Sequence, residues 1–162
     1  MKLNEFIKKI LFNFFIIIFI FFLDRLSKNL VLEYFNQSID QSFVINSYLR
    51  FTLLWNGGVA FGLLHFEEKL FYNIITSLIC IVLIIVIWLS IKSSGLKRIC
   101  YLMILGGGLG NIFDRLHYGS VIDFIDINYK NFHWFIFNVA DIFITLGVLI
   151  LLFLELTKKK ND

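Results

Sequence analysis

Residues 70–91, LFYNIITSLICIVLIIVIWLSI, contain no charged side chain and decide the class of fold. At about 1.5 Å per residue, a helix over this stretch crosses the roughly 30 Å hydrocarbon core of a bilayer. The whole chain of 162 residues is 59% hydrophobic, whereas soluble domains are closer to half apolar. Because this excess comes in long blocks, the chain is predicted to be an integral membrane protein.

Three further apolar blocks flank this stretch. The first block of the chain runs from Ile10 to Leu23, and its helix is expected to continue to about residue 32. The third block is shorter and rich in glycine, and the fourth carries polar residues in its first two turns. We therefore predict a single domain with four membrane spans, at about residues 10–32, 69–91, 98–114 and 135–156.

Basic residues gather at one end of these spans. They precede the first span, join the second to the third and follow the fourth, as Lys2, Lys8, Lys9, Lys92, Lys97, Arg98, Lys158, Lys159 and Lys160. Lys and Arg mark the cytoplasmic ends of membrane spans, so both termini are expected in the cytoplasm. Residues 33–68 and 115–134 then lie on the outer side.

The two outer segments differ in their sequence pattern. In the first, β-rich runs between Ser42 and Leu64 are broken by Asn56-Gly57-Gly58, which is typical of short strands joined by a turn. A small sheet on the membrane surface is expected there. The second segment, from Val121 to Trp134, is mostly aromatic and aliphatic and is predicted to lie along the interface.

Asp123 and Asp141 flank the beginning of the fourth apolar block, on the outer side. Carboxylates are rare beside membrane spans, because burying an unpaired charge there costs several kcal/mol. Asp141 lies at most about 10 Å into the fourth span by helical rise, so the two carboxyl groups can meet near the interface. Such a pair shares a proton and offers a general base and a general acid. Taken singly, Asp141 could instead be a helix-start residue favoured by the dipole, and Asp123 a solvated charge.

Four polar motifs occur in order along the chain. They are Asp24-Arg25-Leu26-Ser27-Lys28, Asn56-Gly57-Gly58-Val59-Ala60-Phe61-Gly62, Gly107-Gly108-Leu109-Gly110-Asn111-Ile112-Phe113-Asp114-Arg115 with Gly119-Ser120-Val121-Ile122-Asp123-Phe124, and Phe137-Asn138-Val139-Ala140-Asp141. Together they resemble the signature of lipoprotein signal peptidase (signal peptidase II), over about residues 20–145. One position departs from that signature, because the family's first motif has Gln where this chain has Arg25.

The resemblance implies a metal-free aspartyl endopeptidase of the bacterial inner membrane, with its active site at the periplasmic face. It implies a mainly α fold, with four transmembrane helices, a small periplasmic β-cradle and a short interfacial segment between helices three and four. Asp123 and Asp141 match the catalytic pair, and the match selects Asp123 over its neighbour Asp126. Positions matching those that hold substrate or the antibiotic globomycin are Asn56, Gly58, Asn111, Arg115 and Asn138.

The same resemblance implies the substrate and the partners. The enzyme would remove the signal peptide from prolipoproteins, cutting just before a cysteine that carries diacylglycerol. Membrane lipid surrounds it, and no cofactor is expected. We expect a monomer with no nucleic-acid partner, since a formal net charge of +3 is too small to favour one.

Spacing indicates supporting roles for other polar residues. Asp24 and Lys28 are four apart, and we expect them to neutralise each other at the interface rather than to touch substrate. Asp114 can form a structural ion pair with its neighbour Arg115. Alternatively, Arg115 donates hydrogen bonds to a substrate carbonyl, and the sequence leaves these two alternatives open.

Two more patterns concern helix packing and the fourth span. Asn138 lies three residues before Asp141, so its side chain can orient that carboxyl or the peptide substrate. Gly106 and Gly110 form a small-xxx-small pattern, which predicts close packing between helices.

The sequence argues against other classes of hydrolase. It contains neither the His-Glu-x-x-His of zinc proteases nor the Gly-x-Ser-x-Gly of serine hydrolases. The remaining alternative is a small non-enzymatic transporter or proton channel, whose polar residues would have to cross the whole bilayer. Here they cluster at one end of the spans, which favours a hydrolytic site near the membrane surface.

Overall fold

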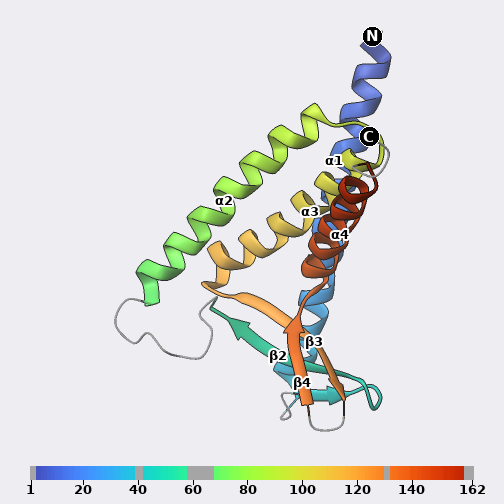
Figure 1. The fold of residues 1–162 in the computed structure, drawn as a ribbon. Helices are drawn as coiled ribbons and strands as arrows, with labels where there is room; N and C mark the ends of the chain where they lie inside the picture. Colours follow the sequence, from blue (N-terminus) through green and yellow to red (C-terminus); the bar gives the residue numbers. More distant parts are fainter. Residues whose placement is uncertain (1–2, 39–41, 58–67, 130–131, 159–162) are drawn as a thin grey trace.

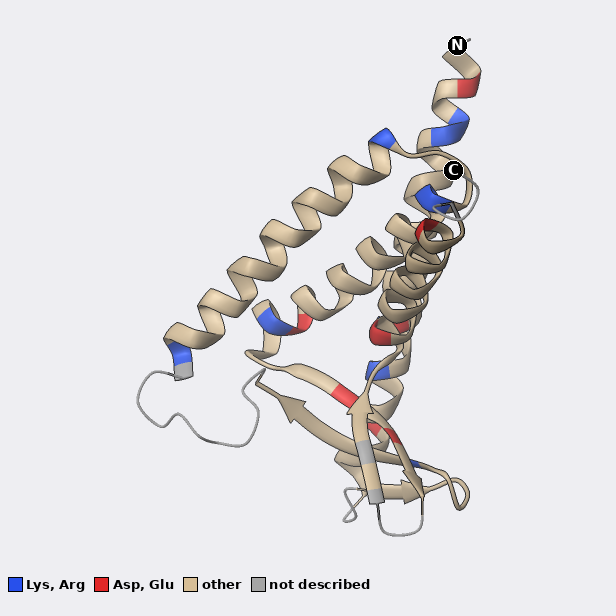
Figure 2. Ribbon diagram, in the orientation of Figure 1, with Lys and Arg blue, Asp and Glu red and all other residues tan. Residues whose placement is uncertain are grey.

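A computed structural model describes residues 3–38, 42–57, 68–129 and 132–158. Four helices stand on a small sheet (Figure 1), and they are α1 (Leu3–Gln37), α2 (Glu68–Lys92), α3 (Gly95–Tyr118) and α4 (Val139–Lys158). The start of α1 and the end of α4 lie at the end of the helices that is remote from the sheet (Figure 1). Lys and Arg residues, blue in Figure 2, occur at this end as well as near the sheet, and here Lys97 pairs with Glu155 at 2.9 Å.

Three described helices are long and apolar enough to cross a membrane, namely Leu3–Gln37, Lys69–Lys92 and Val139–Thr157. The glycines and polar residues of α3 lower its hydropathy, so it is not among them. It nevertheless packs against all three of the others and forms the centre of the bundle. Its contact with α2 is an apolar cluster of buried residues, Leu83, Val86, Leu102 and Leu105.

The glycines of α3 let its neighbours approach closely, as the sequence predicted for Gly106 and Gly110. A Cβ at Gly106 would lie 2.8 Å from a side chain of α1, and a Cβ at Gly110 would lie 2.5 Å from Asp24 Oδ2. Both distances are shorter than any real contact of a Cβ atom. On another face of the helix, a Cβ at Gly107 would lie 2.5 Å from the carbonyl oxygen of Ala140 on α4. Helices α1 and α4 therefore both pack directly on the backbone of α3.

The sheet is antiparallel, with strands in the order β1-β2-β3-β4. Their bounds are Ser42–Val44, Leu49–Asn56, Val121–Tyr129 and Phe132–Phe137. The expected sheet between Ser42 and Leu64 is thus present as β1 and β2, while residues 58–64 lie outside the described part. The register pairs Asn56 with Val121 and Leu54 with Asp123, with an irregularity between Phe51 and Leu54.

The second outer segment, Val121 to Trp134, which the sequence predicted only to lie along the interface, forms β3 and the first part of β4 of the same sheet. An isolated peptide at the interface leaves backbone groups unpaired, and pairing with β2 satisfies them. The fourth helix was expected to begin at residue 135. It begins at Val139 instead, because residues 135–137 belong to β4. The first helix is longer than expected and ends at Gln37, because the apolar run marks only its hydrophobic part.

A second buried cluster fixes the sheet to the bundle. Val31 and Phe35 near the end of α1 pack on Phe124 of β3. Successive side chains of a strand point to opposite faces. Docking Phe124 on α1 therefore directs its neighbour Asp123 to the other face of β3.

Candidate active site

Asp123 of β3 and Asp141 of α4 are linked through Asn138, the residue just before α4. Asn138 Nδ2 donates to Asp123 Oδ1 at 2.7 Å, and its backbone N–H donates to Asp141 Oδ2 at 3.2 Å. In return, the backbone N–H of Asp141 donates to Asn138 Oδ1 at 3.0 Å. This reciprocal pattern is a helix-capping box, so the start of α4 itself sets the position of the Asp141 carboxylate.

Two further asparagines complete the contacts of the two carboxylates. Asn56 Nδ2, at the end of β2, donates to Asp123 Oδ2 at 2.8 Å. Asn111 Nδ2, on α3, donates to Asp141 Oδ1 at 2.8 Å. Each of the four carboxylate oxygens thus accepts a hydrogen bond from an asparagine, three from side-chain amides and one from the backbone N–H of Asn138. The three asparagines lie on β2, on α3 and just before α4.

Asp123 is only 2% exposed. Burial raises the pKa of its carboxyl from 3.8 to about 6, and the negative charge of Asp141 also raises it. The amides of Asn56 and Asn138 and the charge of Lys28 lower the pKa and limit the shift. A carboxyl that titrates near neutral pH can both hold and release a proton under physiological conditions, as general acid–base chemistry requires.

A cluster of four buried ions from α1 and α3 lies beside this pair. Lys28 Nζ lies 2.9 Å from Asp24 Oδ2 and 2.6 Å from Asp114 Oδ2. Arg25 bridges the same two carboxylates, at 2.8 Å to Asp24 and 2.5 Å to Asp114. The expected pair of Asp24 and Lys28 is confirmed, but it is fully buried within this quartet rather than isolated at the interface.

Lys28 also connects the quartet to the two aspartates. Its Nζ donates to Asn111 Oδ1 at 3.2 Å, and Asn138 Nδ2 reaches the same oxygen at 3.1 Å. With its oxygen held in this way, the amide of Asn111 turns its nitrogen toward Asp141. Asn111 and Asp114 therefore share a face of α3, and both contact Lys28.

A family model described as signal peptidase (SPase) II matches residues 16–157 of the chain. The chain belongs to this family. It is 40% identical to a lipoprotein signal peptidase of Pelagibacter ubique (strain HTCC1062), over 99% of this chain and 98% of that protein. It is 44% identical to a lipoprotein signal peptidase of Francisella tularensis subsp. mediasiatica (strain FSC147), over 75% of this chain and 78% of that protein.

Solved structures show the same fold. A bacterial membrane enzyme determined by the in meso method at 2.3 Å resolution superposes with a TM-score of 0.73 at 31% identity, over 93% of this chain and 90% of that one. A second such structure, at 1.9 Å resolution, gives a TM-score of 0.72 at 31% identity, over 89% of this chain and 92% of that one. The chain is therefore a membrane-bound bacterial protease of the signal peptidase II family. Nothing in these relationships supports a transporter or a channel.

In this signal peptidase II chain, Arg115 forms no ion pair with any described residue, because Asp114 pairs with Arg25 and Lys28 instead. Its guanidinium lies over the ring of Tyr72, 5.3 Å from the centroid, and the Tyr72 hydroxyl donates to the Arg115 carbonyl at 2.8 Å. Arg115 is 9% exposed, yet its Nε and one terminal nitrogen have no hydrogen-bond partner among the described residues. Of the two alternatives for Arg115, the ion pair with Asp114 was wrong.

The remaining acidic residue of β3 lies apart from the pair. Asp126 is 1% exposed and contacts Nδ1 of His133 at 2.8 Å. The hydroxyl of Thr52 donates to it at 3.4 Å. Spacing alone could not separate Asp126 from Asp123, whereas the hydrogen bonds do. The other residue matched to the signature, Gly58, lies outside the described residues.

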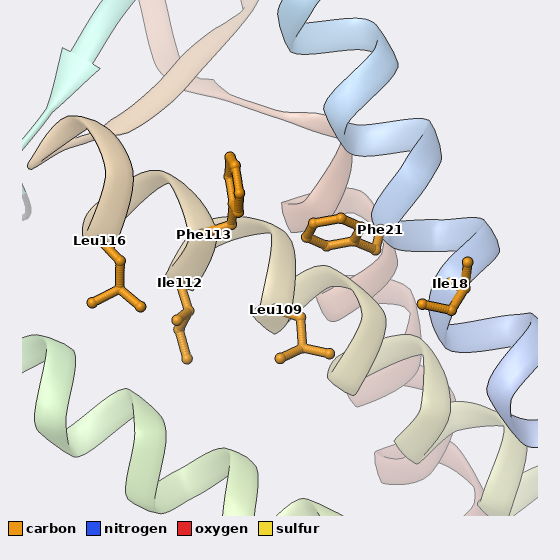
Figure 3. A pocket seen from close by; sticks show the side chains of 6 residues that line it. All are labelled: Ile18, Phe21, Leu109, Ile112, Phe113 and Leu116. Carbon is orange, nitrogen blue, oxygen red and sulfur yellow. The ribbon is translucent and has the colours of Figure 1, made fainter.

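An apolar surface groove lies between α1 and α3 (Figure 3). It has a volume of about 320 Å³ and is lined by Ile18, Phe21, Leu109, Ile112, Phe113 and Leu116. The ring of Phe113 lies between this groove and the ions, with the Arg25 guanidinium 4.8 Å from its centroid. One wall of the groove, Phe113, therefore also packs against the quartet. Sequence reasoning missed Arg25, although its place beside Asp24 in the first motif was a signal for it.

Proposed function

We propose that this chain is a metal-independent aspartyl endopeptidase. It removes the signal peptide from prolipoproteins and cuts on the N-terminal side of the diacylglyceryl-modified cysteine. The observation that carries the proposal is the bridging of Asp123 and Asp141 by Asn138. Family membership supplies the substrate class, and the asparagine amides supply a preorganised setting for two carboxylates that share a proton.

The chemistry follows from that shared proton. The ionised carboxylate takes a proton from water, and the resulting hydroxide attacks the carbonyl carbon of the scissile peptide. The protonated carboxyl gives its proton to the carbonyl oxygen, which forms a neutral gem-diol. The C–N bond then breaks as the protonated carboxyl gives its proton to the leaving nitrogen. At the same time the other carboxylate takes a proton from a hydroxyl of the gem-diol, so one carboxyl is again protonated for the next cycle. The raised pKa of Asp123 suits it to hold the shared proton.

The other polar residues at the site bind the peptide. Arg115, whose buried donors face no described acceptor, donates hydrogen bonds to a carbonyl of the substrate. Asn56, Asn111 and Asn138, which contact the two aspartates, bind the peptide as well. The signature assigns Gly58 to the same role, and globomycin competes there with substrate. Asp24, Lys28 and Asp114 support the site without touching the peptide.

The protein is a monomer that crosses the inner membrane four times, with α3 as the shielded central span. At 24 residues, α3 is about 36 Å long, which is sufficient for a crossing. Both termini are cytoplasmic, because Lys92, Lys97 and Arg98 lie where α2 connects to α3, at the end of the helices remote from the sheet (Figure 2). The sheet and the dyad then face the periplasm.

The test is cleavage of a diacylglyceryl-modified prolipoprotein by the purified protein in detergent. Asp123→Asn and Asp141→Asn should each lower kcat by about 10²-fold or more, because each removes one carboxyl of the acid–base pair. Asp126→Asn is the matched control, since it changes a buried carboxyl of the same strand that lies outside the pair. Full activity in either dyad variant would end the aspartyl mechanism, and inhibition by EDTA would end metal independence.

A further inference from the structure

We propose that Arg25 is a positioning residue of the dyad. It holds the carboxylates of Asp24 and Asp114 in place, and these bind the backbone immediately before each catalytic aspartate. This inference rests on the proposed function. It concerns a residue at which this chain departs from the signature of its family.

Each anion of the quartet holds one backbone N–H. Asp24 Oδ1 accepts from the N–H of Ala140 at 3.0 Å, and Ala140 immediately precedes Asp141. Asp114 Oδ2 accepts from the N–H of Ile122 at 3.2 Å, and Ile122 immediately precedes Asp123. The carboxylates of α1 and α3 therefore clamp the chain one residue before each member of the dyad.

Arg25 sets the spacing of these two clamps. One terminal nitrogen contacts Asp24 Oδ2 at 2.8 Å, and the other lies 2.5 Å from Asp114 Oδ1. A guanidinium presents its donors in a rigid planar fork, so it holds two carboxylates at a defined separation. The ring of Phe113 packs at 4.8 Å against it, and the Gly110 carbonyl lies 3.4 Å from the same nitrogen that meets Asp24. Lys28 contacts the same two carboxylates, but a single ammonium fixes distances without fixing a plane.

Arg25 also balances the charge of the quartet. Two cations face two anions, and all four side chains are at most 11% exposed. Without Arg25, Asp24 and Asp114 would compete for Lys28, and one buried negative charge would be unbalanced beside the dyad. The groups that face Asp123 are Asn56 of β2, Asn138 and Asp141 at the start of α4, and Lys28 of α1.

A net negative charge near the dyad favours its protonated form. The pH–activity profile of a variant without Arg25 should therefore shift to higher pH, by on the order of one unit, because a nearby like charge raises the pKa of a carboxyl. A residue that only stabilised the fold would change the amount of folded enzyme and leave this profile in place.

The experiment compares Arg25→Gln and Arg25→Lys in the purified full-length protein, with kcat, KM and the pH profile measured on a diacylglyceryl-modified prolipoprotein. Arg25→Gln should lower kcat about tenfold, with KM within about threefold, and shift the profile upward. Arg25→Lys keeps the positive charge but lacks the planar guanidinium. Its pH–activity profile should therefore match that of the wild type, while its kcat stays below the wild-type value. Lys97→Gln is the control, because it breaks an exposed ion pair with Glu155 at the far end of α3.

A wild-type kcat and profile in Arg25→Gln would overturn the proposal, and so would a lower kcat with an unmoved profile. If Arg25→Gln does not fold, Arg25→Lys decides, because wild-type kcat in that variant would exclude a role for the fork. Asp123→Asn is measured alongside these variants. An active Asp123→Asn enzyme would refute the proposed function itself, whereas a normal Arg25→Gln enzyme with an inactive Asp123→Asn enzyme refutes only the role of Arg25.

Discussion

Gly110→Ala tests whether the close packing of α3 on α1 serves the site as well as the fold. The added Cβ would lie 2.5 Å from Asp24 Oδ2 and 3.1 Å from Asp24 Cγ. Since an ordinary carbon–oxygen contact is about 3.3 Å, the carboxylate must move by roughly 0.8 Å. Overpacking of this kind costs about 1–3 kcal/mol of folding stability.

The displaced carboxylate is the one that binds the N–H of Ala140, at 3.0 Å. A movement of this size stretches that hydrogen bond beyond its normal range, so the start of α4 loses its anchor. Misplacement of a catalytic group by about 1 Å lowers the rate about 10²-fold. We therefore expect Gly110→Ala to lower kcat about 10²-fold with little change in KM.

Gly106→Ala is the matched control, because it lies one turn away on the same face of α3. Its Cβ would clash at 2.8 Å with the apolar side chain of Ile20 and not with a carboxylate. Thermal unfolding in detergent should show a similar loss of stability in both variants, while kcat falls strongly only in Gly110→Ala. Wild-type kcat in Gly110→Ala, or an equal loss in Gly106→Ala, would refute this reasoning.

Three other predictions concern single side chains of the site. Asn138→Ala removes the amide donor to Asp123 and the cap of α4, so it should destabilise the protein by about 1 kcal/mol in thermal unfolding and lower kcat about 10²-fold. Arg115→Lys keeps the charge but loses the planar donors, and KM for the prolipoprotein should rise about tenfold; an unchanged KM would remove Arg115 from the binding site. The pKa of Asp123 is raised to about 6 by burial, so the folded state binds more protons than the unfolded state between pH 4 and 6. The free energy of unfolding of the wild type should consequently fall by about 3 kcal/mol in total as pH rises through this window. Asp123→Asn lacks the titrating carboxyl, so its stability relative to the wild type should increase between pH 4 and 7. A constant difference across that window would contradict the burial effect.

The alternation of residues from Val121 to Tyr129 shows why one part of the fold could not be predicted. Its aliphatic and aromatic composition fits both an interfacial peptide and a strand. The partner that selects the strand is β2, more than sixty positions earlier in the chain. A local pattern carries no information about such a partner, because backbone pairing depends on where the two segments meet.

The sequence by itself determined the membrane class, the four helices and the identity of the polar residues, because hydrophobic length and motif order are local properties. Even the link between Asn138 and Asp141 was visible in their spacing, since a helix cap needs only three residues. The partners of Asp114 were decided by the tertiary structure alone, and so were the contacts of Asp126 with Thr52 and His133, which hold it away from the dyad. Buried ions pair with whatever opposite charge the packing brings near, and the glycines of α3 bring α1 close enough to supply Arg25 and Lys28.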